Sequence, residues 1–599
     1  MNIFSKLLRE IKFIRRSKKM LAAVADVDSQ SSNLVPDDIE KSVDKFADNL
    51  AFISDNGQWT YREFDDYANQ VAHWAVAQGC VQGDTLAIFA RNRLEYVALW
   101  YGLSKIGVVP ALINYQLRSK ALAHCVSISK AKMALIDVEF LDAWKSAKAH
   151  LPKGLVSFVA FGTSSVKNMK SFDHERAEQP TTRPDRSLRD GIIAGDVFMN
   201  MFTSGTTGLP KAAKVSHTRG QYYLRGFVVA SNSGPQDRMM MVLPMYHATG
   251  GLCGVGMALM RGGAVIVRPR FSVSQFWKDA TKYKATLFMY VGELCRFLLN
   301  GPPDPYERKH KIRCIIGNGL PLDVWEPFIE RFGIKDVVEF YGATEGNVSL
   351  INVGGVVGSV GRIPKYLRDK LNGEIIVYDV ETDTYPKGKD GFYQRAKPGQ
   401  IGELMGEIKP GETRFRYDGY KSKAASQKKV LHDVFKKGDM WFRTGDLFRR
   451  DVDNNFFFVD RMGDTYRWKA ENVATGEVAA VLNSVAGVHQ ANVYGVPVPG
   501  YDGKAGMASL VVDNDVDLNA LYEKVTEGLP AFARPVFLRL SEDSETTGTF
   551  KYKKTDLVKD GFDPSRIKDK LYVAHSKSNG YVPLDEDVYE QIKKGVVRF

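Results

Sequence analysis

The sequence predicts an α/β protein with a large N-terminal domain of helix-covered sheets, a β-rich subdomain and a small α+β C-terminal domain. Between residues 85 and 341, apolar runs of strand length alternate with helix-length segments, a pattern typical of parallel sheets covered by helices. From 350 to about 440 the apolar runs are short and interrupted by Gly, Pro and charges, which indicates a β-rich subdomain. After Asp460 the alternation of strands and helices returns, which indicates a separate α+β unit.

The individual elements follow from these patterns. A strand at 85–90, a helix at 92–106 and a strand at 108–113 form one βαβ unit. The strands expected after it are 197–202, 264–267, 285–291, 312–316 and 337–341, and the expected helices follow 216 and cover 272–283, 292–299 and 321–331. In the C-terminal part we expect strands at 490–496 and 508–512 and helices near 475–486 and 517–527.

Length and composition indicate more than one domain. The chain has 599 residues, of which 44% are hydrophobic and 25% charged, so it can bury a large core. We expect a leader at 1–30, a large domain at 31–461 and a small domain at 462–599. The five cysteines are far apart and never form a CxxC pair. This argues against a disulfide scaffold or a structural zinc site and favours a reducing compartment.

Two segments raise the question of a membrane. Residues 239–260 carry no charge and are long enough to span a bilayer, but the segment contains Pro244, His247 and four glycines, so we expect a buried strand, loop and helix instead. Residues 1–20 hold seven basic side chains and one acidic one, and we identify no secretory signal there. On a helical wheel, apolar and basic residues of this leader separate. The leader is therefore either a helix on an anionic membrane surface, through residues 1–19, or a helix packed on its own protein. The apolar residues are Phe4, Leu7, Leu8, Ile11 and Ile14, and the basic ones are Lys6, Arg9, Lys12 and Arg16.

The strongest local signal is the string TSGTTGLPK at 203–211, which follows an expected strand. Its glycines allow backbone N–H groups to point into one concavity, its hydroxyls add donors and Lys211 adds a positive charge, so the loop suits a polyphosphate. It is not a Walker A loop, because no GK[ST] follows the second glycine at the required spacing.

Together with other strings, this loop resembles the adenylate-forming superfamily of acyl-CoA synthetases, luciferases and nonribosomal-peptide adenylation domains. YGATE at 341–345, RTGD at 443–446 and Asp460-Arg461 appear in the expected order. The strings YVGELCRFLLN (290–300), EFYGATEGN (339–347), GDTYRWKAENVAT (463–475) and TTGTFKYKKTDL (546–557) are similar to one branch, the very-long-chain acyl-CoA synthetases, also called fatty acid transport proteins.

The resemblance implies roles for individual residues. Thr344 would donate to the α-phosphate, and Glu345 would bind Mg²⁺, a hard cation that prefers carboxylate and phosphate oxygens. Asp446 and Arg461 would bind the ribose hydroxyls. The residues implied for the phosphates are Thr203, Ser204, Gly205, Thr206, Thr207, Gly208 and Lys211, and those implied for adenine are Gly317, Asn318, Gly319, Tyr341 and Gly342.

The resemblance also implies a mobile small domain. Lys551 would bridge the carboxylate and the nucleotide during adenylation, although Lys553 and Lys554 are adjacent alternatives. Rotation about a hinge near Gly463 and Asp464 would then turn other residues toward CoA. Those residues are Arg467, Trp468 and Lys469, and Ala470 stands where the branch usually has glycine.

The resemblance therefore implies an ATP-dependent fatty acid:CoA ligase for long or very long chains that uses ATP, Mg²⁺ and CoA on the cytoplasmic face of a membrane. We expect the acyl pocket within 245–256 and 288–298, and His247 is either a channel residue or a core residue. Two alternatives stay open: a ligase for another acid, such as a sterol side-chain, bile or aryl acid, and a fatty acid uptake or transport protein. No motif for nucleic acid is present.

Overall fold

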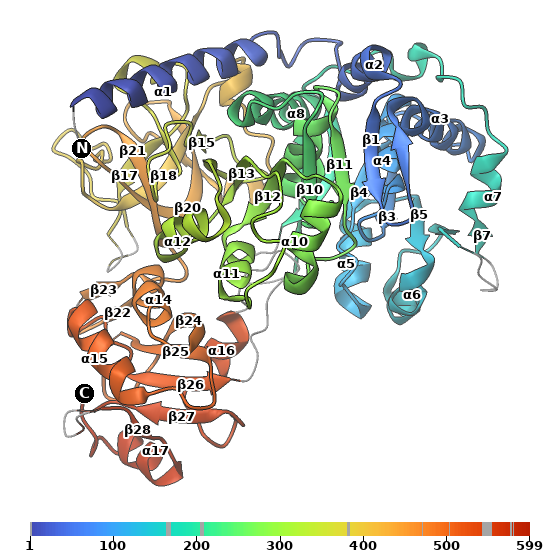
Figure 1. Ribbon diagram of the computed structural model, residues 1–599. Coiled ribbons are helices and arrows are strands. Elements are labelled where there is room, and N and C mark those ends of the chain that lie inside the picture. Colours follow the sequence, from blue (N-terminus) through green and yellow to red (C-terminus); the bar gives the residue numbers. More distant parts are fainter. Residues whose placement is uncertain are drawn as a thin grey trace.

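The computed structural model describes residues 3–162, 169–203, 209–379, 382, 384–469, 471–501, 503–541, 554–575, 578 and 580–599. A large part built on two sheets and a β-rich region lies above a smaller C-terminal lobe in Figure 1. Its alternating strands and helices confirm the predicted α/β class.

The first sheet has seven strands and contains the predicted βαβ unit. Every residue of its strand β3 is buried, as expected for a parallel strand covered on both faces. All its pairings are parallel except that between the last two strands. In spatial order its strands are β7 (Lys170–Ser171), β6 (Val156–Ala160), β5 (Met133–Asp137), β3 (Thr85–Phe89), β4 (Val109–Leu112), β8 (Val197–Thr203) and β9 (Lys211–Ser216). Its helices are α3 (Tyr61–Ala77), α4 (Glu95–Lys105), α5 (Ser119–Ser129), α6 (Leu141–Ala147) and α7 (Phe172–Ala177).

The second sheet has eight strands, parallel except at its two ends. Two of its strands come from residues 50–60, far from the rest in sequence, which the strand pattern did not predict. The strands are β15 (Ser349–Ile351), β14 (Asp336–Gly342), β13 (Cys314–Asn318), β12 (Leu287–Val291), β10 (Arg238–Met241), β11 (Ala264–Val267), β1 (Leu50–Ser54) and β2 (Gly57–Thr60). The helices between them are α8 (His217–Ser231), α9 (Val255–Leu259), α10 (Val273–Lys282), α11 (Gly292–Asn300) and α12 (Leu322–Phe332).

The uncharged segment 239–260 forms the expected buried strand, loop and helix. It holds β10, a π-helical turn at Thr249–Gly254 and α9. Of the helices in the described residues, none combines the length and the apolarity that a bilayer crossing needs.

The β-rich region and the small lobe have their own hydrophobic clusters. The β-rich sheet is antiparallel and contains β16 (Gly361–Arg362), β21 (Asn455–Arg461), β20 (Met440–Arg450), β18 (Gly402–Ile408), β17 (Glu374–Val377) and β19 (Val430–His432), with helix α13 (Lys423–Gln427) beside it in sequence. The lobe contains β22 (Tyr466–Trp468) and β23 (Glu471–Val473), then a sheet of β24 (Val488–Val496), β25 (Ala505–Val512), β26 (Phe537–Ser541), β27 (Lys570–Val573) and β28 (Val582–Pro583), and helices α14 (Thr475–Asn483), α15 (Leu518–Gly528), α16 (Lys554–Asp560) and α17 (Glu586–Lys593).

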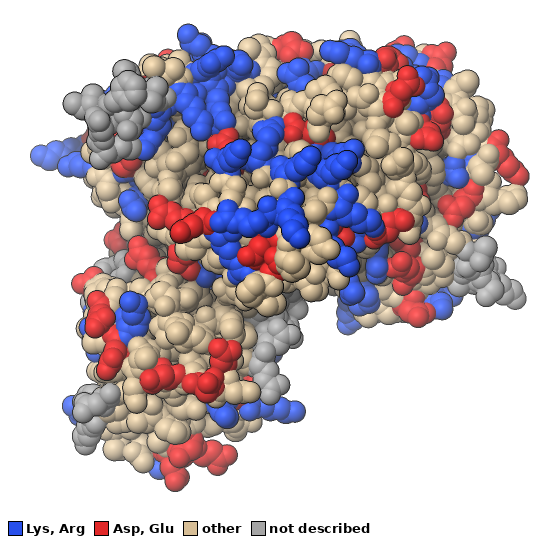
Figure 2. Space-filling view, in the orientation of Figure 1, with Lys and Arg blue, Asp and Glu red and all other residues tan. Residues whose placement is uncertain are grey.

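Helix α1 (Ile3–Ala23) lies across the large part of the molecule (Figure 1). Phe13 is 3% exposed and joins the main core, and Arg16 donates to Asp336 at 2.6 Å. Ile11, on the predicted apolar side, is 53% exposed and so does not pack on the domain, and the alternative in which this side faces a membrane stays a prediction. The face of α1 that packs on the domain carries Phe13 and Met20. The shape of the domain surface determines which side of the helix is buried, so the apolar residues of the first two turns do not predict it. Lys and Arg side chains gather over this part of the surface in Figure 2.

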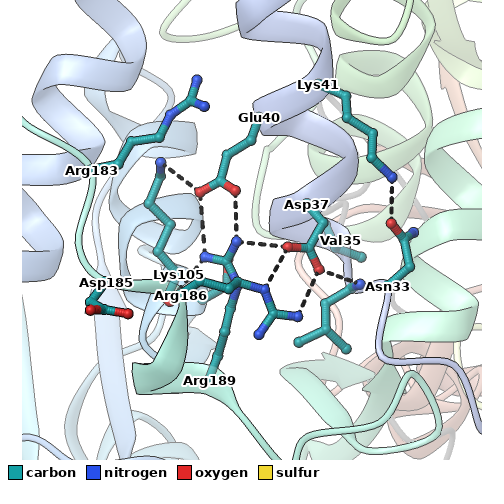
Figure 3. Close-up of polar contacts among 12 residues, drawn as sticks. Asn33, Val35, Asp37, Glu40, Lys41, Lys105, Arg183, Asp185, Arg186 and Arg189 are labelled. Carbon is teal, nitrogen blue, oxygen red and sulfur yellow. Dashed lines mark hydrogen bonds and ion pairs between the residues drawn. The ribbon is translucent and has the colours of Figure 1, made fainter.

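Buried ion pairs connect helix α2 (Val35–Phe46) to Lys105, the last residue of α4, and to Arg189 (Figure 3). Arg189 is 2% exposed and contacts Asp37 at 2.7 Å and Glu40 at 2.6 Å. Lys105, which is fully buried, contacts Glu40 at 3.1 Å. Because each of these charges has an opposite partner, the group fixes the position of α2 and leaves no charge for a ligand.

Candidate active site

The ends of the predicted phosphate loop lie together at the edge of the first sheet. Thr203, the last residue of β8, is the register partner of Lys211, the first residue of β9. The loop residues between them, Ser204, Gly205, Thr206, Thr207 and Gly208, lie outside the described part of the chain. The described flanks show where the loop begins and ends, and its contacts with phosphate stay a prediction.

Tyr420 joins this loop flank to the predicted Mg²⁺ ligand. The segment around it runs beside β9, where the Lys214 N–H donates to the Gly419 carbonyl at 3.1 Å. The Tyr420 ring centroid lies 5.5 Å from Lys211 Nζ, and the Tyr420 hydroxyl donates to Glu345 Oε1 at 2.5 Å. Lys211 and Glu345 therefore contact the same tyrosine, and their binding of phosphate and metal stays a prediction. The sequence reasoning missed Tyr420, because nothing in its local sequence separates it from other loop tyrosines.

Arg219 holds the loop that carries Thr344 and Glu345. It stands in the first turn of α8, and its guanidinium donates to the Thr344 carbonyl at 3.1 Å and also to the Gly346 carbonyl. Asp418 accepts from its Nε at 3.2 Å and balances its charge. The pKa of Arg219 is raised, because the attraction of Asp418 and Tyr223 exceeds the effect of burial. No local sequence pattern indicates Arg219, since its contacts are with a loop far away in the chain.

The structure brings the predicted ribose residues together. The Tyr341 hydroxyl donates to Asp446 Oδ2 at 2.5 Å. Asp446 on β20 and Arg461 on β21 are register partners, with Arg461 Nε 4.0 Å from Asp446 Oδ1. Burial and the neighbouring Asp446 carboxylate raise the pKa of Tyr341, so this hydroxyl stays a donor. Gly342 follows at the end of β14.

Residues 317–320 turn at the end of β13, beside β14. A side chain at Gly317 would place its Cβ 2.2 Å from the Tyr290 carbonyl oxygen, and Gly319 has φ of +76°, so both positions require glycine. Asn318 ends the strand between them. Glu339 accepts hydrogen bonds from the N–H groups of Gly319 and Leu320 and from the Tyr290 hydroxyl. Burial raises the pKa of Glu339 to about 8, although these hydrogen bonds oppose the shift.

The raised pKa of Glu339 predicts a loss of stability with rising pH. The folded protein keeps this proton up to a pH of about 8, whereas a free glutamate releases it near 4.5. The stabilisation is therefore complete below the lower value and is lost as the pH rises through the upper one. We expect the free energy of unfolding of wild type, relative to Glu339→Gln, to fall by up to about 1.4 kcal/mol per pH unit in that window. Urea midpoints of the large domain measure this difference, and a difference independent of pH would contradict the assignment.

The donors around Glu345 fit a magnesium ion that arrives with a nucleotide. Among the described residues, no three His, Cys, Asp or Glu side chains lie close enough to enclose a metal. Mg²⁺ is usually bound by one or two carboxylates, with water and phosphate oxygens completing its shell. The Glu345 carboxylate, beside the Tyr420 hydroxyl, supplies the protein oxygen that such a site needs.

The predicted CoA-facing residues differ in exposure. Lys469 is exposed with φ of +52°, and Arg467 is half-buried. Trp468 is 1% exposed and packs on Tyr501 at 5.1 Å between ring centroids, inside the cluster of the small lobe. The Trp468 ring is thus buried inside the lobe, and the expectation that this residue faces CoA after rotation stays a prediction. Ala470 lies outside the described residues.

Of the three candidate lysines, Lys554 is the one that lies in the described part of the chain. Lys554 donates to Thr475 Oγ1 at 2.9 Å and lies 3.4 Å from Asp464 Oδ2, in the predicted hinge. Thr475 donates in turn to Asp460 at 2.8 Å. Lys554 thus contacts its own lobe and the hinge. Lys551 and Lys553 lie outside the described residues, and the preference for Lys551 stays a prediction.

A cavity of about 260 Å³ connects this polar site with apolar surroundings. Tyr341, Gly342 and Thr344 line it, together with side chains of α8 and α1. From the predicted acyl segment 245–256, the residues that line it are Ala248, Thr249 and Cys253. Residues 288–298 do not line this cavity, because their apolar side chains fill the core of the second sheet. His247 is half-buried against the Tyr246 ring, at 4.4 Å between centroids, and does not line it either.

Comparison with known proteins identifies the family and the fold. The AMP-binding enzyme family model matches residues 39–405, and the model of the AMP-binding enzyme C-terminal domain matches 477–551. An anthranilate CoA ligase solved in complex with anthranoyl-AMP has the same fold, with a TM-score of 0.75 at 20% identity over 89% of this chain and 98% of that one.

Curated relatives are more similar in sequence. Long-chain fatty acid transport protein 6 of Mus musculus is 39% identical over 559 residues, which cover 92% of this chain and 88% of the relative. Long-chain fatty acid transport protein 1 of Rattus norvegicus is 40% identical over 542 residues, or 90% of this chain and 83% of the relative. The chain therefore belongs to the AMP-binding enzyme family, in the branch of the long-chain fatty acid transport proteins and very-long-chain acyl-CoA synthetases.

Proposed function

We propose that the protein is an ATP-dependent ligase that joins long- or very-long-chain fatty acids to CoA. The observation that carries this proposal is that the cavity lined by Arg219, Tyr341 and Thr344 lies beside linked polar groups. Arg219 holds the Thr344 loop, Tyr341 donates to Asp446, and Glu345, the residue after Thr344, is bonded to Tyr420 beside Lys211. The apolar remainder of the cavity suits an aliphatic chain. The names of the relatives support a fatty acid as the ligand.

The chemistry needs two displacements. In the first, a carboxylate oxygen bonds to the α-phosphorus of ATP, the bond to pyrophosphate breaks, and an acyl-adenylate forms. In the second, the thiol sulfur of CoA bonds to the acyl carbon, AMP leaves and the thiol proton passes to water. Positioned cations and N–H donors stabilise charge that develops at phosphate. In our proposal Lys211, Thr344 and Lys551 supply them, and Asp446 holds the ribose.

Magnesium would be bound by Glu345 and would neutralise phosphate charge. The contribution of the chain is the fixed position of that carboxylate, which depends on Tyr420 and on the loop clasped by Arg219.

Acid-dependent release of pyrophosphate, measured with and without CoA, tests the proposal. Saturated fatty acids, a bile acid and benzoate form the panel. Pyrophosphate release and thioester formation with long fatty acids support it. Preference for the bile acid or benzoate identifies the alternative ligases, and no release with any acid favours a fatty acid uptake or transport protein.

We further propose that α1 brings the protein to an anionic membrane on its cytoplasmic face. The exposed face of α1 carries Arg15, Lys18 and Lys19, while its inner face packs on the domain. The contact would therefore be electrostatic and peripheral, without burial of Phe13 in lipid.

Charge reversal of Arg15, Lys18 and Lys19 to Glu tests this contact. Because each basic residue near an anionic surface contributes about 1 kcal/mol, we expect binding to phosphatidylserine-containing vesicles to weaken by about 10²-fold at low salt. Co-sedimentation measures it. The same reversal at the exposed Lys559, Lys568 and Lys570 of the small lobe is the control. Equal effects in both triple variants would contradict a role for α1. Deletion of 1–19 is less informative, since it removes Phe13 from the core.

A further inference from the structure

Helix α1 forms one wall of the cavity that reaches the candidate active site. Its lining residues recur every three or four positions and so share one helix face. That face is apolar except for one hydroxyl, and the exposed face carries four basic residues together with Ile11 and Ala22. The lining residues are Phe13, Ser17, Met20, Leu21 and Val24.

Helix α8 forms the facing wall. Tyr222, Tyr223 and Phe227 line the cavity, and Gly226 lies among them. A Cβ added at Gly226 would meet no atom within 4 Å, so this helical glycine leaves open space toward the cavity. Glycine inside a helix costs about 1 kcal/mol relative to alanine, which indicates that the space has a use.

The way α1 is attached also indicates a binding site. Polar contacts hold it at its flanks, where Glu10 pairs with Arg362 and Arg16 pairs with Asp336. Beyond these contacts toward the C-terminal end of α1, Met20 is only partly buried against the core. The cavity is mainly apolar between the two helices, and charged side chains such as Arg219, Lys370 and Asp418 line other parts of it. Protein interiors pack to near-crystalline density, so such a cavity is typical of a ligand site and not of ordinary packing.

We propose that the compartment between α1 and α8 binds the methyl-terminal half of a long acyl chain, and that α1 sets the longest chain the site accepts. This inference rests on the proposed function and extends it to residues that the family motifs do not include. The carboxyl end of the acid lies near Thr344, which lines the same cavity. Each methylene that enters the compartment increases affinity about fourfold.

Two substitutions narrow the compartment from opposite walls. Leu21→Trp enlarges a lining residue on α1, and Gly226→Leu fills the space on α8. The control is Ala22→Trp, which places the same side chain on the exposed face of α1. We expect the ratio of kcat/KM for a twenty-four-carbon acid to that for a twelve-carbon acid to fall at least about tenfold in both lining variants and to stay as in wild type in the control. An unchanged ratio in the two lining variants, with wild-type thermal unfolding, overturns the proposal.

A binding measurement separates this inference from the proposed ligase activity. A long-chain fatty acid with a diazirine at its methyl end is photolysed with the full-length protein, and cross-linked peptides are identified by mass spectrometry. Cross-links in 13–24 and 222–227 support the compartment even if no acid is ligated. Cross-links confined to other segments, or none at any acid concentration, overturn it even if ligation proceeds.

Discussion

Glu345→Gln is expected to lower acid-dependent pyrophosphate release by about 10²–10³-fold, the usual cost of losing one preorganised electrostatic contact to a developing charge. The amide keeps the size of the side chain and still accepts the hydrogen bond from Tyr420. It lacks the negative charge that attracts a magnesium ion, so the Mg²⁺ concentration for half-maximal rate rises as well. Initial rates over a Mg²⁺ titration measure both effects.

Tyr420→Phe is the matched control for this prediction. The substitution removes the Tyr420 hydroxyl, which donates to Glu345 Oε1, and leaves the carboxylate charged. The aromatic ring at position 420 remains beside Lys211. We expect the rate of pyrophosphate release to fall about tenfold, as is usual when one hydrogen bond from a neutral hydroxyl to a charged group is lost. If Glu345→Gln retained wild-type rates at limiting Mg²⁺, the carboxylate would not be the magnesium ligand.

Lys551→Ala is expected to lower adenylation by about 10²–10³-fold while leaving the second half-reaction nearly intact. The reason is geometric: in the proposed cycle this lysine contacts the nucleotide only before the small lobe rotates. Pyrophosphate release measures the first step, and conversion of synthetic acyl-adenylate and CoA to thioester measures the second.

Lys553→Ala, two residues away, is the control for charge in this segment, and it should affect neither step strongly. Lys554 is a poorer control, because it contacts the hinge through Asp464. Equal losses in both half-reactions for Lys551→Ala would assign this lysine to folding or domain orientation. Loss of adenylation in Lys553→Ala alone would transfer the role to that residue.

Local patterns predicted most of the fold, because a buried parallel strand or a covering helix has a recognisable spacing of apolar residues within its own segment. The strand at 264–267 and the helix at 321–331 match β11 and α12 closely. Strands β1 and β2 were not predicted, since their place depends on pairing with β11. The side of α1 that packs on the domain was not predictable, since it depends on a distant surface that leaves Ile11 uncovered.

The residues of the candidate site likewise fall into those that a sequence motif indicates and those that only the folded structure shows. Tyr341, Asp446 and Arg461 carry motifs, and the structure brings them together. Arg219 and Tyr420 act on Glu345 through contacts between distant segments, so no sequence window contains both partners. The ring of Trp468, beside motif positions, lies in the core of the small lobe, which its local sequence did not indicate.

The pairing of β1 with β11 has a consequence for the nascent protein. Phe52 leaves the ribosome about two hundred residues before its register partner Val265, which at about 5–20 residues per second amounts to roughly 10–40 s of translation. During that interval the apolar edge of Leu50–Ser54 has no neighbour on one side, so molecular chaperones have time to bind it.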